Sequence, residues 1–145
     1  DDTVVLELYR QGRVGQLLLS CHADWFRVHL VTKRPSVPNT PPAFCSALRS
    51  RLMQSALVEM RMVACDRVLE LEFEGHPESE FPGPFRLIAE LMGKHSNLIL
   101  VDEKRKIVSA AKWVGASKSS RPILPNRTYE RPPVLGEQGD LTTFD

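Results

Sequence analysis

The sequence predicts one domain of the α+β class, mainly antiparallel β, folded as a β-sandwich or partly open barrel with one main helix. Two observations predict this fold. Short stretches rich in branched and aromatic residues, about eight in all, recur between turn residues. Only one segment repeats apolar residues every four positions, as the buried face of a helix does. A chain of this length buries roughly two thirds of its unfolded surface, so it needs no disulfides.

The first three predicted strands form a hairpin and its neighbour. Val4, Leu6 and Leu8 alternate with polar residues, as in a strand with one buried face. The three strands are expected at residues 4–8, 14–20 and 25–31, with a turn at residues 11–13.

An extended connection and the one predicted helix follow. Prolines between residues 35 and 42 keep the chain extended. Thr40 is placed to cap a helix over residues 41–54, which has Pro41 in its first turn. Three apolar residues recur every four positions and predict its core-facing side: Phe44, Leu48 and Leu52.

The second half of the chain predicts strands and then an arm. Strands are expected at residues 56–63, 68–73, 85–91, 97–101 and 107–112. Beyond Gly115 the chain is rich in Ser, Pro and Arg, so we expect an extended arm over the surface that is too polar to add a layer to the core. Residues 1–115 are therefore expected to form a β-rich body, and residues 116–145 the closing arm of the same domain.

Charge is distributed in opposed blocks, although the net charge is only +1. Residues 27–51 contain five Lys and Arg and no acid, and residues 104–131 contain eight against one Glu. Residues 56–81 contain seven acids against two Arg. The folded domain could thus present one electropositive face, and the alternative is evenly solvated strands of alternating charge.

Cysteine usage and the lack of a membrane segment indicate the cytoplasm. Cys21, Cys45 and Cys65 are odd in number and far apart, so we expect thiols in a reducing compartment. No apolar run approaches the length of a membrane span, and the opening Asp1-Asp2 is unlike a secretion signal. The chain starts on a strand without Met, so we expect a piece of a longer protein.

A polar corner between two predicted strands is the first candidate site. Gly93 supplies the positive φ that a tight reversal needs. Lys94, His95, Ser96 and Asn97 are expected to place four hydrogen-bonding side chains on one exposed tip, suited to a phosphate or a base edge. The alternative is a solvated hairpin turn without a ligand.

The Asp66-Arg67 pair is the second candidate site, where two predicted strands meet. A guanidinium can clamp a phosphate or stack on a base, and a carboxylate can accept a hydrogen bond from a base amine. The alternative is an Asp that bonds its own backbone beside a solvated Arg.

Other kinds of site are not predicted. The four histidines have no helical pairing and no Cys/His cluster appears, so we expect no metal and no cofactor. No catalytic motif is found either, so we expect no enzyme. Four aromatic residues could stack on unpaired RNA bases, although most are expected in the core: Trp25, Phe26, Trp113 and Tyr129. Trp25 and Phe26 are adjacent in a predicted strand, so at most one should be buried.

Residues 90–97, Glu-Leu-Met-Gly-Lys-His-Ser-Asn, resemble the E-(L/I)-M-G-(K/R)-H-S-N signature of the NFACT N-terminal domain. The family is known both as fibronectin-binding protein A and as RqcH-type ribosome quality control factors. Further segments resemble the family in order: residues 17–20 and 26–30, residues 41–45 with 48–49, the Asp66-Arg67 pair, and residues 121–125 with Tyr129 and Pro132-Pro133. The resemblance implies a β-sandwich similar to the N-terminal domain of formamidopyrimidine-DNA glycosylases. It also implies that an opening helix, a coiled coil and a C-terminal region belong to the full-length protein.

The resemblance implies an RNA-binding module that recognises tRNA and the large ribosomal subunit and directs alanine-rich tailing of stalled chains. It implies direct contact by Asp66 and Arg67, and a second contact or its support from Met92, Gly93 and the four residues that follow. Four basic residues are expected as phosphate partners on charge alone: Arg49, Lys112, Arg121 and Arg127. Two alternatives remain, a fibronectin-binding adhesin domain and a glycosylase-like DNA-binding domain.

Overall fold

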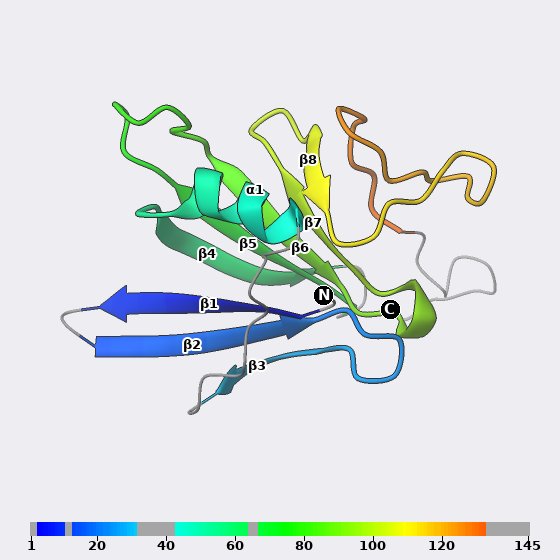
Figure 1. Ribbon diagram of the computed structural model, residues 1–145, viewed down its shortest axis with the longest axis horizontal. Helices are drawn as coiled ribbons and strands as arrows, with labels where there is room; N and C mark the ends of the chain where they lie inside the picture. The colour runs from blue at the N-terminus through cyan, green and yellow to red at the C-terminus, as the bar shows by residue number, and fades with distance from the viewer. Residues whose placement is uncertain (1–2, 11–12, 32–42, 64–66, 133–145) are drawn as a thin grey trace.

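The computed structural model describes residues 3–10, 13–31, 43–63 and 67–132, which form two antiparallel sheets and one helix (Figure 1). The smaller sheet has the order β1-β2-β3 and the larger sheet the order β4-β5-β6-β7-β8, so neighbours in the sequence are neighbours in space. The strands are β1 (Thr3–Arg10), β2 (Arg13–Ser20), β3 (Arg27–Val31), β4 (Ala56–Val63), β5 (Val68–Glu74), β6 (Phe85–Glu90), β7 (Asn97–Val101) and β8 (Ile107–Ala110). The predicted class, mainly antiparallel β with one main helix, is confirmed. The similarity to the glycosylase domain stays a prediction.

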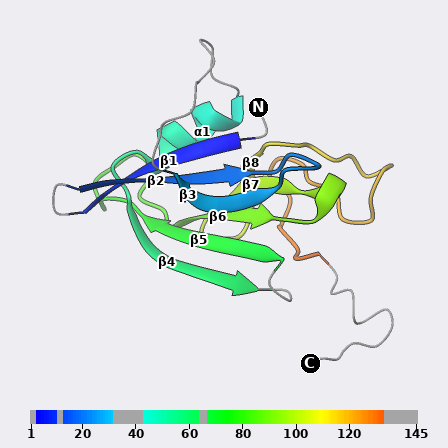
Figure 2. The same ribbon diagram turned by 90° about the horizontal axis from the view of Figure 1, so that it is seen from below.

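The helix α1 (Ala43–Leu52) lies beside β1 and β8, at one side of the two stacked sheets (Figure 2). Phe44 and Leu48 of its predicted core face are buried, and Leu52 packs partly against the same core. The helix ends before the predicted Gln54 because that residue has a φ of +64°, a left-handed conformation that ends a helix. Thr40 and Pro41 lie outside the described residues, as do Gln11 and Gly12 of the predicted first turn.

The main core fills the space between the two sheets. Side chains alternate along β5, so Leu69, Leu71 and Phe73 face this core. β6 contributes Leu87 and β7 contributes Leu100 in the same way, opposite Leu17 and Leu19 of β2. This packing fixes the register of both sheets, because a slip of one residue would turn the apolar side chains to the other face.

A second apolar cluster covers the outer face of the large sheet, the face turned away from the small sheet. It contains Val68, Ile88, Ile99 and other strand residues together with Ile123 and Tyr129, which come from the arm. Ile123 and Tyr129 are each only 3% exposed. The expectation that the arm is too polar to add a layer to the core was therefore wrong. The middle strands are apolar on both faces, and the outer face needs a cover.

The strand boundaries differ from the prediction at two candidate residues, Trp25 and Lys112. β3 begins at Arg27 rather than Trp25, because residues 23–25 form a turn; Trp25 and Phe26 are 66% and 38% exposed. β8 ends at Ala110 rather than Lys112. The backbone of Lys112 bonds the Asn97 side chain instead of a neighbouring strand.

Within the described ranges, no helix is long and apolar enough to cross a membrane. The same residues hold no group of three or more His, Cys, Asp or Glu that could bind a metal ion.

Candidate functional site

The corner, residues 91–96, joins β6 to β7 through one turn of 3₁₀ helix, η1 (Gly93–His95). Gly93 has a φ of +60°, as predicted. The Met92 N–H donates to the Ser96 hydroxyl oxygen at 2.8 Å, and the Ser96 N–H donates to the Gly93 carbonyl at 3.0 Å. Ser96 is 1% exposed, so its hydroxyl holds the corner closed rather than facing solvent. The corner is therefore a fixed loop whose outward side is formed by Lys94 and His95.

Asn97 ties the corner to the strand end beside it. Its Oδ1 accepts hydrogen bonds from the Leu98 and Lys112 N–H groups, both at 2.9 Å. Its Nδ2 donates to the Lys112 carbonyl at 2.8 Å. Asn97 is 3% exposed. The prediction of four exposed polar side chains was thus wrong for Ser96 and Asn97, because the backbone of the loop and of Lys112 uses their hydrogen-bonding groups.

Lys112 connects the two sheets. Its ammonium donates to the Cys21 carbonyl, just beyond the end of β2, at 2.7 Å. Its backbone is held by Asn97 at the same time. One lysine therefore joins the corner of the large sheet to the loop that follows β2 in the small sheet. Lys112 is half-buried and its ammonium has an internal acceptor, and its predicted role as a phosphate partner stays a prediction.

Arg67 lies at the same end of the large sheet as the corner. The Leu91 N–H donates to the Arg67 carbonyl at 2.9 Å, and the next residue, Val68, pairs with Glu90. The Arg67 side chain is exposed, as are those of Lys94 and His95. None of the three side chains forms an ion pair or hydrogen bond with a residue of the described ranges. The structure thus brings Arg67 together with the corner, whereas Asp66 lies outside the described residues.

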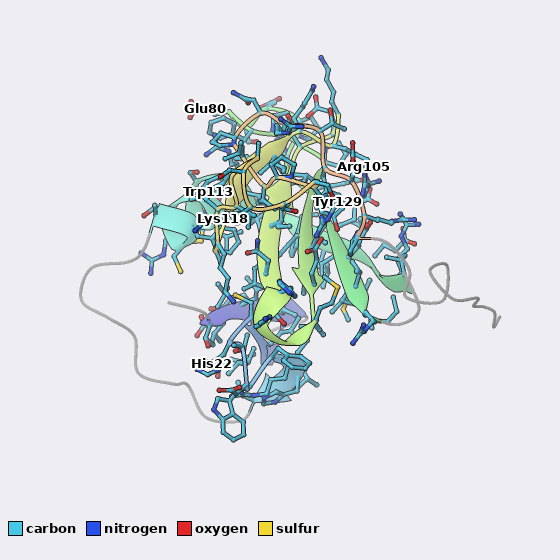
Figure 3. The ribbon with its side chains drawn as sticks, turned by 90° about the vertical axis from the view of Figure 1, so that its right-hand side faces the viewer. His22, Glu80, Arg105, Trp113, Lys118 and Tyr129 are labelled. Carbon is cyan, nitrogen blue, oxygen red and sulfur yellow. The ribbon has the colours of Figure 1, made fainter. Side chains whose placement is uncertain are left out.

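Figure 3 looks onto this end of the molecule. It shows η1 between the loop that carries His22 and the arm that carries Lys118. The hydrogen bond from Lys112 to Cys21 places the His22 loop next to the corner, as the figure indicates. We call this surface, made of Arg67, Lys94, His95 and residues 21–27, the basic end. Residue patterns did not single out His22, whereas Arg27 belongs to the basic block of residues 27–51 and Trp25 was a candidate for base stacking.

Arg121 has a different environment from the one predicted. Its guanidinium holds the Glu90 carboxylate in two contacts, Nη2 to Oε1 at 2.8 Å and Nη1 to Oε2 at 3.0 Å. Nη1 also donates to the Glu130 carbonyl at 2.7 Å. Glu90 is 1% exposed, so Arg121 neutralises a buried charge and anchors the arm. The geometry does not present it to a phosphate.

Tyr129 completes this buried group. Its hydroxyl donates to Glu90 Oε2 at 2.6 Å. Burial, followed by the negative charge of Glu90, raises the pKa of the Tyr129 hydroxyl above its usual range. Tyr129 is therefore a neutral hydrogen-bond donor in the core, and it does not offer its ring for base stacking.

Glu70 is a second buried carboxylate on the outer face, and three arginines surround it. Arg105 Nη2 lies 3.3 Å from its Oε2, Arg131 Nε 3.6 Å from the same oxygen, and Arg61 Nη2 3.8 Å from Oε1. Glu70 is 2% exposed. Three of the eight basic residues in 104–131 therefore compensate buried carboxylates: Arg105, Arg121 and Arg131.

The remaining predicted phosphate partners are exposed but lie away from the corner. Arg49 is on α1. The Arg127 carbonyl accepts from the Ile107 N–H, at the end of β8 that pairs with Val101 rather than with the start of β7. The structure does not bring either residue to the basic end.

Comparison with known proteins points to one family. The family described as NFACT N-terminal and middle domains matches residues 1–143. The Rqc2 homolog RqcH of Streptococcus suis (strain 05ZYH33) is 39% identical over 147 residues, which cover 100% of this chain and 27% of that protein. The Rqc2 homolog RqcH of Bacillus subtilis (strain 168) is 30% identical over 133 residues, which cover 90% of this chain and 23% of that protein. The chain thus spans about a quarter of the length of these relatives.

A solved structure gives the same match in three dimensions. The N-terminal part of the fibronectin/fibrinogen-binding protein from Streptococcus suis superposes with a TM-score of 0.84 and 39% identity. The match covers 91% of this chain and 50% of that chain.

Proposed function

We propose a function for this chain, which belongs to the family of NFACT N-terminal and middle domains. It is the RNA-binding module of a ribosome quality control factor and recognises tRNA and the large ribosomal subunit. The protein that contains it directs alanine-rich tailing of stalled nascent chains. The relatives named RqcH support the quality control role. In this proposal the peptide bond is made on the ribosome, in the cytoplasm, and the domain contributes recognition and no catalysis.

The proposal that the domain binds RNA rests on one observation: Arg67 and the corner lie at the same end of the large sheet. Both Arg67 and Lys94 are exposed, and the described residues offer neither of them a carboxylate partner. Uncompensated cations on a fixed scaffold attract phosphates and release counterions when they bind them. Arg67 can also take a phosphate through two parallel hydrogen bonds.

The support beneath these cations favours recognition over a simple solvated turn. Ser96 and Asn97 bury their polar groups to fix the corner, so Lys94 and His95 are displayed on a loop that needs little further ordering. A binding group held in place before contact loses less conformational entropy on binding. The corner is therefore suited to a contact that depends on position.

Titration of purified tRNA over a series of salt concentrations tests the proposal. We expect Arg67→Ala and Lys94→Ala each to weaken binding. Each should also reduce the salt slope, the steepness of log affinity plotted against log salt concentration, by roughly one, the value for one lost phosphate contact. Lys104→Ala is the matched control, because Lys104 is an exposed lysine in the turn between β7 and β8, at the opposite end of the sheet. Unchanged affinity and slope in both test variants would contradict the proposal.

The ribosomal part is tested with the full-length protein. We expect affinity purification from a cell lysate to recover large ribosomal subunits and a restricted set of tRNAs. Recovery of neither would rule out the quality control role, even if the domain bound RNA in isolation.

A second candidate function is binding of an extracellular protein, since the solved relative from Streptococcus suis is named a fibronectin/fibrinogen-binding protein. The two functions differ in their dependence on salt. RNA binding should weaken steeply as salt rises, whereas fibronectin binding by this candidate should tolerate salt. Salt-resistant binding of purified fibronectin together with no tRNA binding would favour the second candidate.

A further inference from the structure

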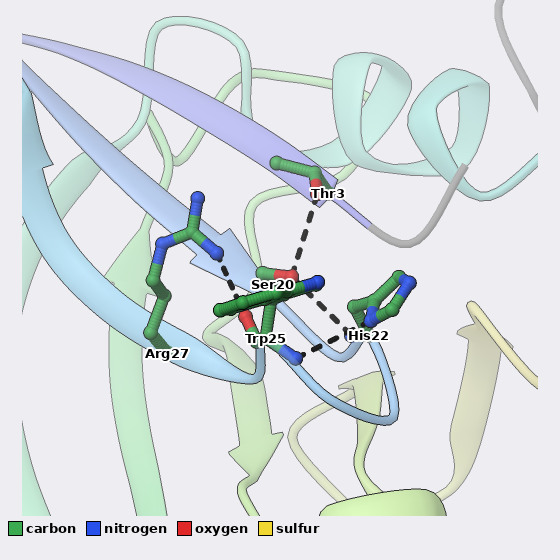
Figure 4. Close-up of a pocket in the computed structure, with 5 residues that line it drawn as sticks. All are labelled: Thr3, Ser20, His22, Trp25 and Arg27. Atoms are coloured by element: carbon green, nitrogen blue, oxygen red, sulfur yellow. Dashed lines mark hydrogen bonds between the residues drawn. The ribbon is translucent and has the colours of Figure 1, made fainter.

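The loop after β2 forms a shallow pocket at the basic end. Thr3, Ser20, His22, Trp25 and Arg27 line the pocket, which has a volume of about 450 Å³ (Figure 4). Its main apolar wall is Trp25, which is 66% exposed. A large aromatic side chain left in solvent is not explained by packing within the described part of the chain.

Side-chain hydrogen bonds hold the loop in shape. His22 Nδ1 accepts from the N–H groups of Asp24 at 3.0 Å and Trp25 at 3.3 Å. The His22 N–H in turn donates to the Ser20 hydroxyl oxygen at 3.2 Å. Figure 4 shows the bonds that join Ser20, His22 and Trp25 around the pocket. The Trp25 backbone is thus fixed while its indole ring stays accessible.

The polar groups of the pocket are mainly donors. Because His22 Nδ1 accepts two hydrogen bonds, the neutral ring carries its proton on Nε2 and can donate from there. Arg27 donates from Nη1 to the Trp25 carbonyl at 2.8 Å and from Nε to His29 Nε2 at 2.9 Å. These bonds fix the guanidinium beside the indole and leave Nη2 without a bond to a described residue. The pocket therefore combines a flat aromatic surface, a cation and an imidazole N–H donor.

We propose that this pocket takes one unpaired nucleobase of RNA. The base stacks on the Trp25 indole, and the phosphate beside it contacts Arg27. Aromatic rings that stack bases next to cations that hold the backbone are the general means of binding single-stranded nucleic acid. The inference rests on the proposed RNA-binding function and deepens it, because it specifies an unpaired nucleotide at a particular place.

The connection through Lys112 makes the pocket part of the same surface as the corner. The Cys21 carbonyl that accepts from Lys112 immediately precedes His22. Asn97, which follows the corner, holds the backbone of Lys112. An RNA bound at Arg67 and Lys94 therefore passes next to a site for one base. The two cations and the Trp25 indole can then contact the same RNA molecule.

Fluorescence can report stacking directly, because the chain has only two tryptophans. In a Trp113→Phe background, the remaining emission comes from Trp25. We expect single-stranded hexa-adenylate to quench this emission, whereas a fully paired RNA duplex should leave it unchanged because the duplex has no free base to stack. Equal quenching by both probes, or by neither, would overturn the proposal.

Affinity measurements on hexa-adenylate give the second test. We expect Trp25→Ala to weaken binding about tenfold, in the range for loss of one stacked base, and Trp25→Phe to retain most of the affinity. Tyr9→Ala is the matched control, since Tyr9 is 71% exposed near the far end of β1. If Trp25→Ala binds like Tyr9→Ala, Trp25 does not stack a base.

The tRNA titration separates the two proposals. The pocket alone is refuted if tRNA binding depends on Arg67 while Trp25→Ala binds hexa-adenylate as tightly as the wild type does. A wild-type chain that binds neither tRNA nor hexa-adenylate refutes the RNA-binding function and the pocket with it.

Discussion

The basic end and the arm-covered outer face both carry several cationic side chains, but they use them in opposite ways. On the outer face, Arg121 holds Glu90, and three further arginines surround Glu70. At the basic end, Arg67 and Lys94 have no acidic partner among the described residues. The difference teaches that a count of basic residues does not locate a binding surface. What matters is whether a buried carboxylate lies within reach of each one.

The strand register explains why the carboxylates are on the outer face. Glu70 lies between Leu69 and Leu71, which face the main core, so alternation along β5 turns it to the other side. Glu90 follows the buried Ala89 of β6 in the same way. The arm then covers both carboxylates, and arginines of the arm, of β4 and of the β7–β8 turn supply the charges that make their burial tolerable.

Breaking the buried ion pair between Arg121 and Glu90 should have the largest effect on stability. We expect Arg121→Met to lower the free energy of unfolding by about 3 to 5 kcal/mol, because it leaves the buried Glu90 carboxylate without its cation. Urea denaturation measures the loss. Lys118→Met, which removes an exposed base of the same arm, should change stability by no more than about 0.5 kcal/mol.

Arg121→Met also distinguishes two roles of Arg121, contact with a phosphate and anchoring of the arm through Glu90. A stability close to that of the wild type, together with a smaller salt slope for tRNA, would mean that Arg121 contacts phosphate, as its charge first suggested. A large loss of stability with an unchanged slope supports the anchoring role.

Removing the Asn97 side chain, whose hydrogen bonds fix the corner, should have the next largest effect on stability. Asn97→Ala leaves the Leu98 and Lys112 N–H groups without their side-chain acceptor, so we expect a loss of about 3 kcal/mol in thermal or urea unfolding. Lys94→Ala, three residues earlier and exposed, should lower tRNA affinity while stability changes by no more than about 0.5 kcal/mol. Equal stabilities of the two variants would show that the amide does not hold the corner.

Per pH unit, alkaline conditions should have the smallest of these effects on stability, through the buried Tyr129 of the outer face. The pKa of Tyr129 is raised in the folded protein, so the folded state holds this proton more tightly than the unfolded state. The resulting stability is fully present below the unfolded pKa of about 10 and is lost above it, by at most about 1.4 kcal/mol per pH unit. Urea unfolding between neutral and alkaline pH measures the loss.

Two tyrosine variants assign this pH dependence. Tyr129→Phe should flatten the alkaline part of the profile, and Tyr9→Phe should leave it as it is, because Tyr9 is exposed. If the profile of Tyr129→Phe is as steep as that of the wild type, another group causes the loss.

Most of the fold could be predicted because its signals are local. Alternation along Val4 to Leu8 and the branched residues of Asn97 to Val101 predicted strands that the structure contains. The positive φ of Gly93 was predictable for the same reason, since the glycine is in a short connection between two strands.

The site could be predicted only in part because its contacts are distant in the sequence. Arg67 and the corner were identified from their own residues, and their common location follows from strand pairing. The burial of Asn97 depends on Lys112, and that of Glu90 on Arg121, and the partners are 15 and 31 positions apart in the sequence. No local pattern marks such pairs. The apolar role of Ile123 and Tyr129 depends in the same way on a sheet face that only the assembled strands create.

The hydrogen bond from Lys112 to Cys21 has a consequence for how a strand of RNA could lie on the domain. The two loops of the basic end belong to different sheets, and this bond holds them together at the edge of the core that packs the sheets on each other. A ligand that touches both loops must match the distance between them, so that distance is a property of the folded protein rather than of the ligand.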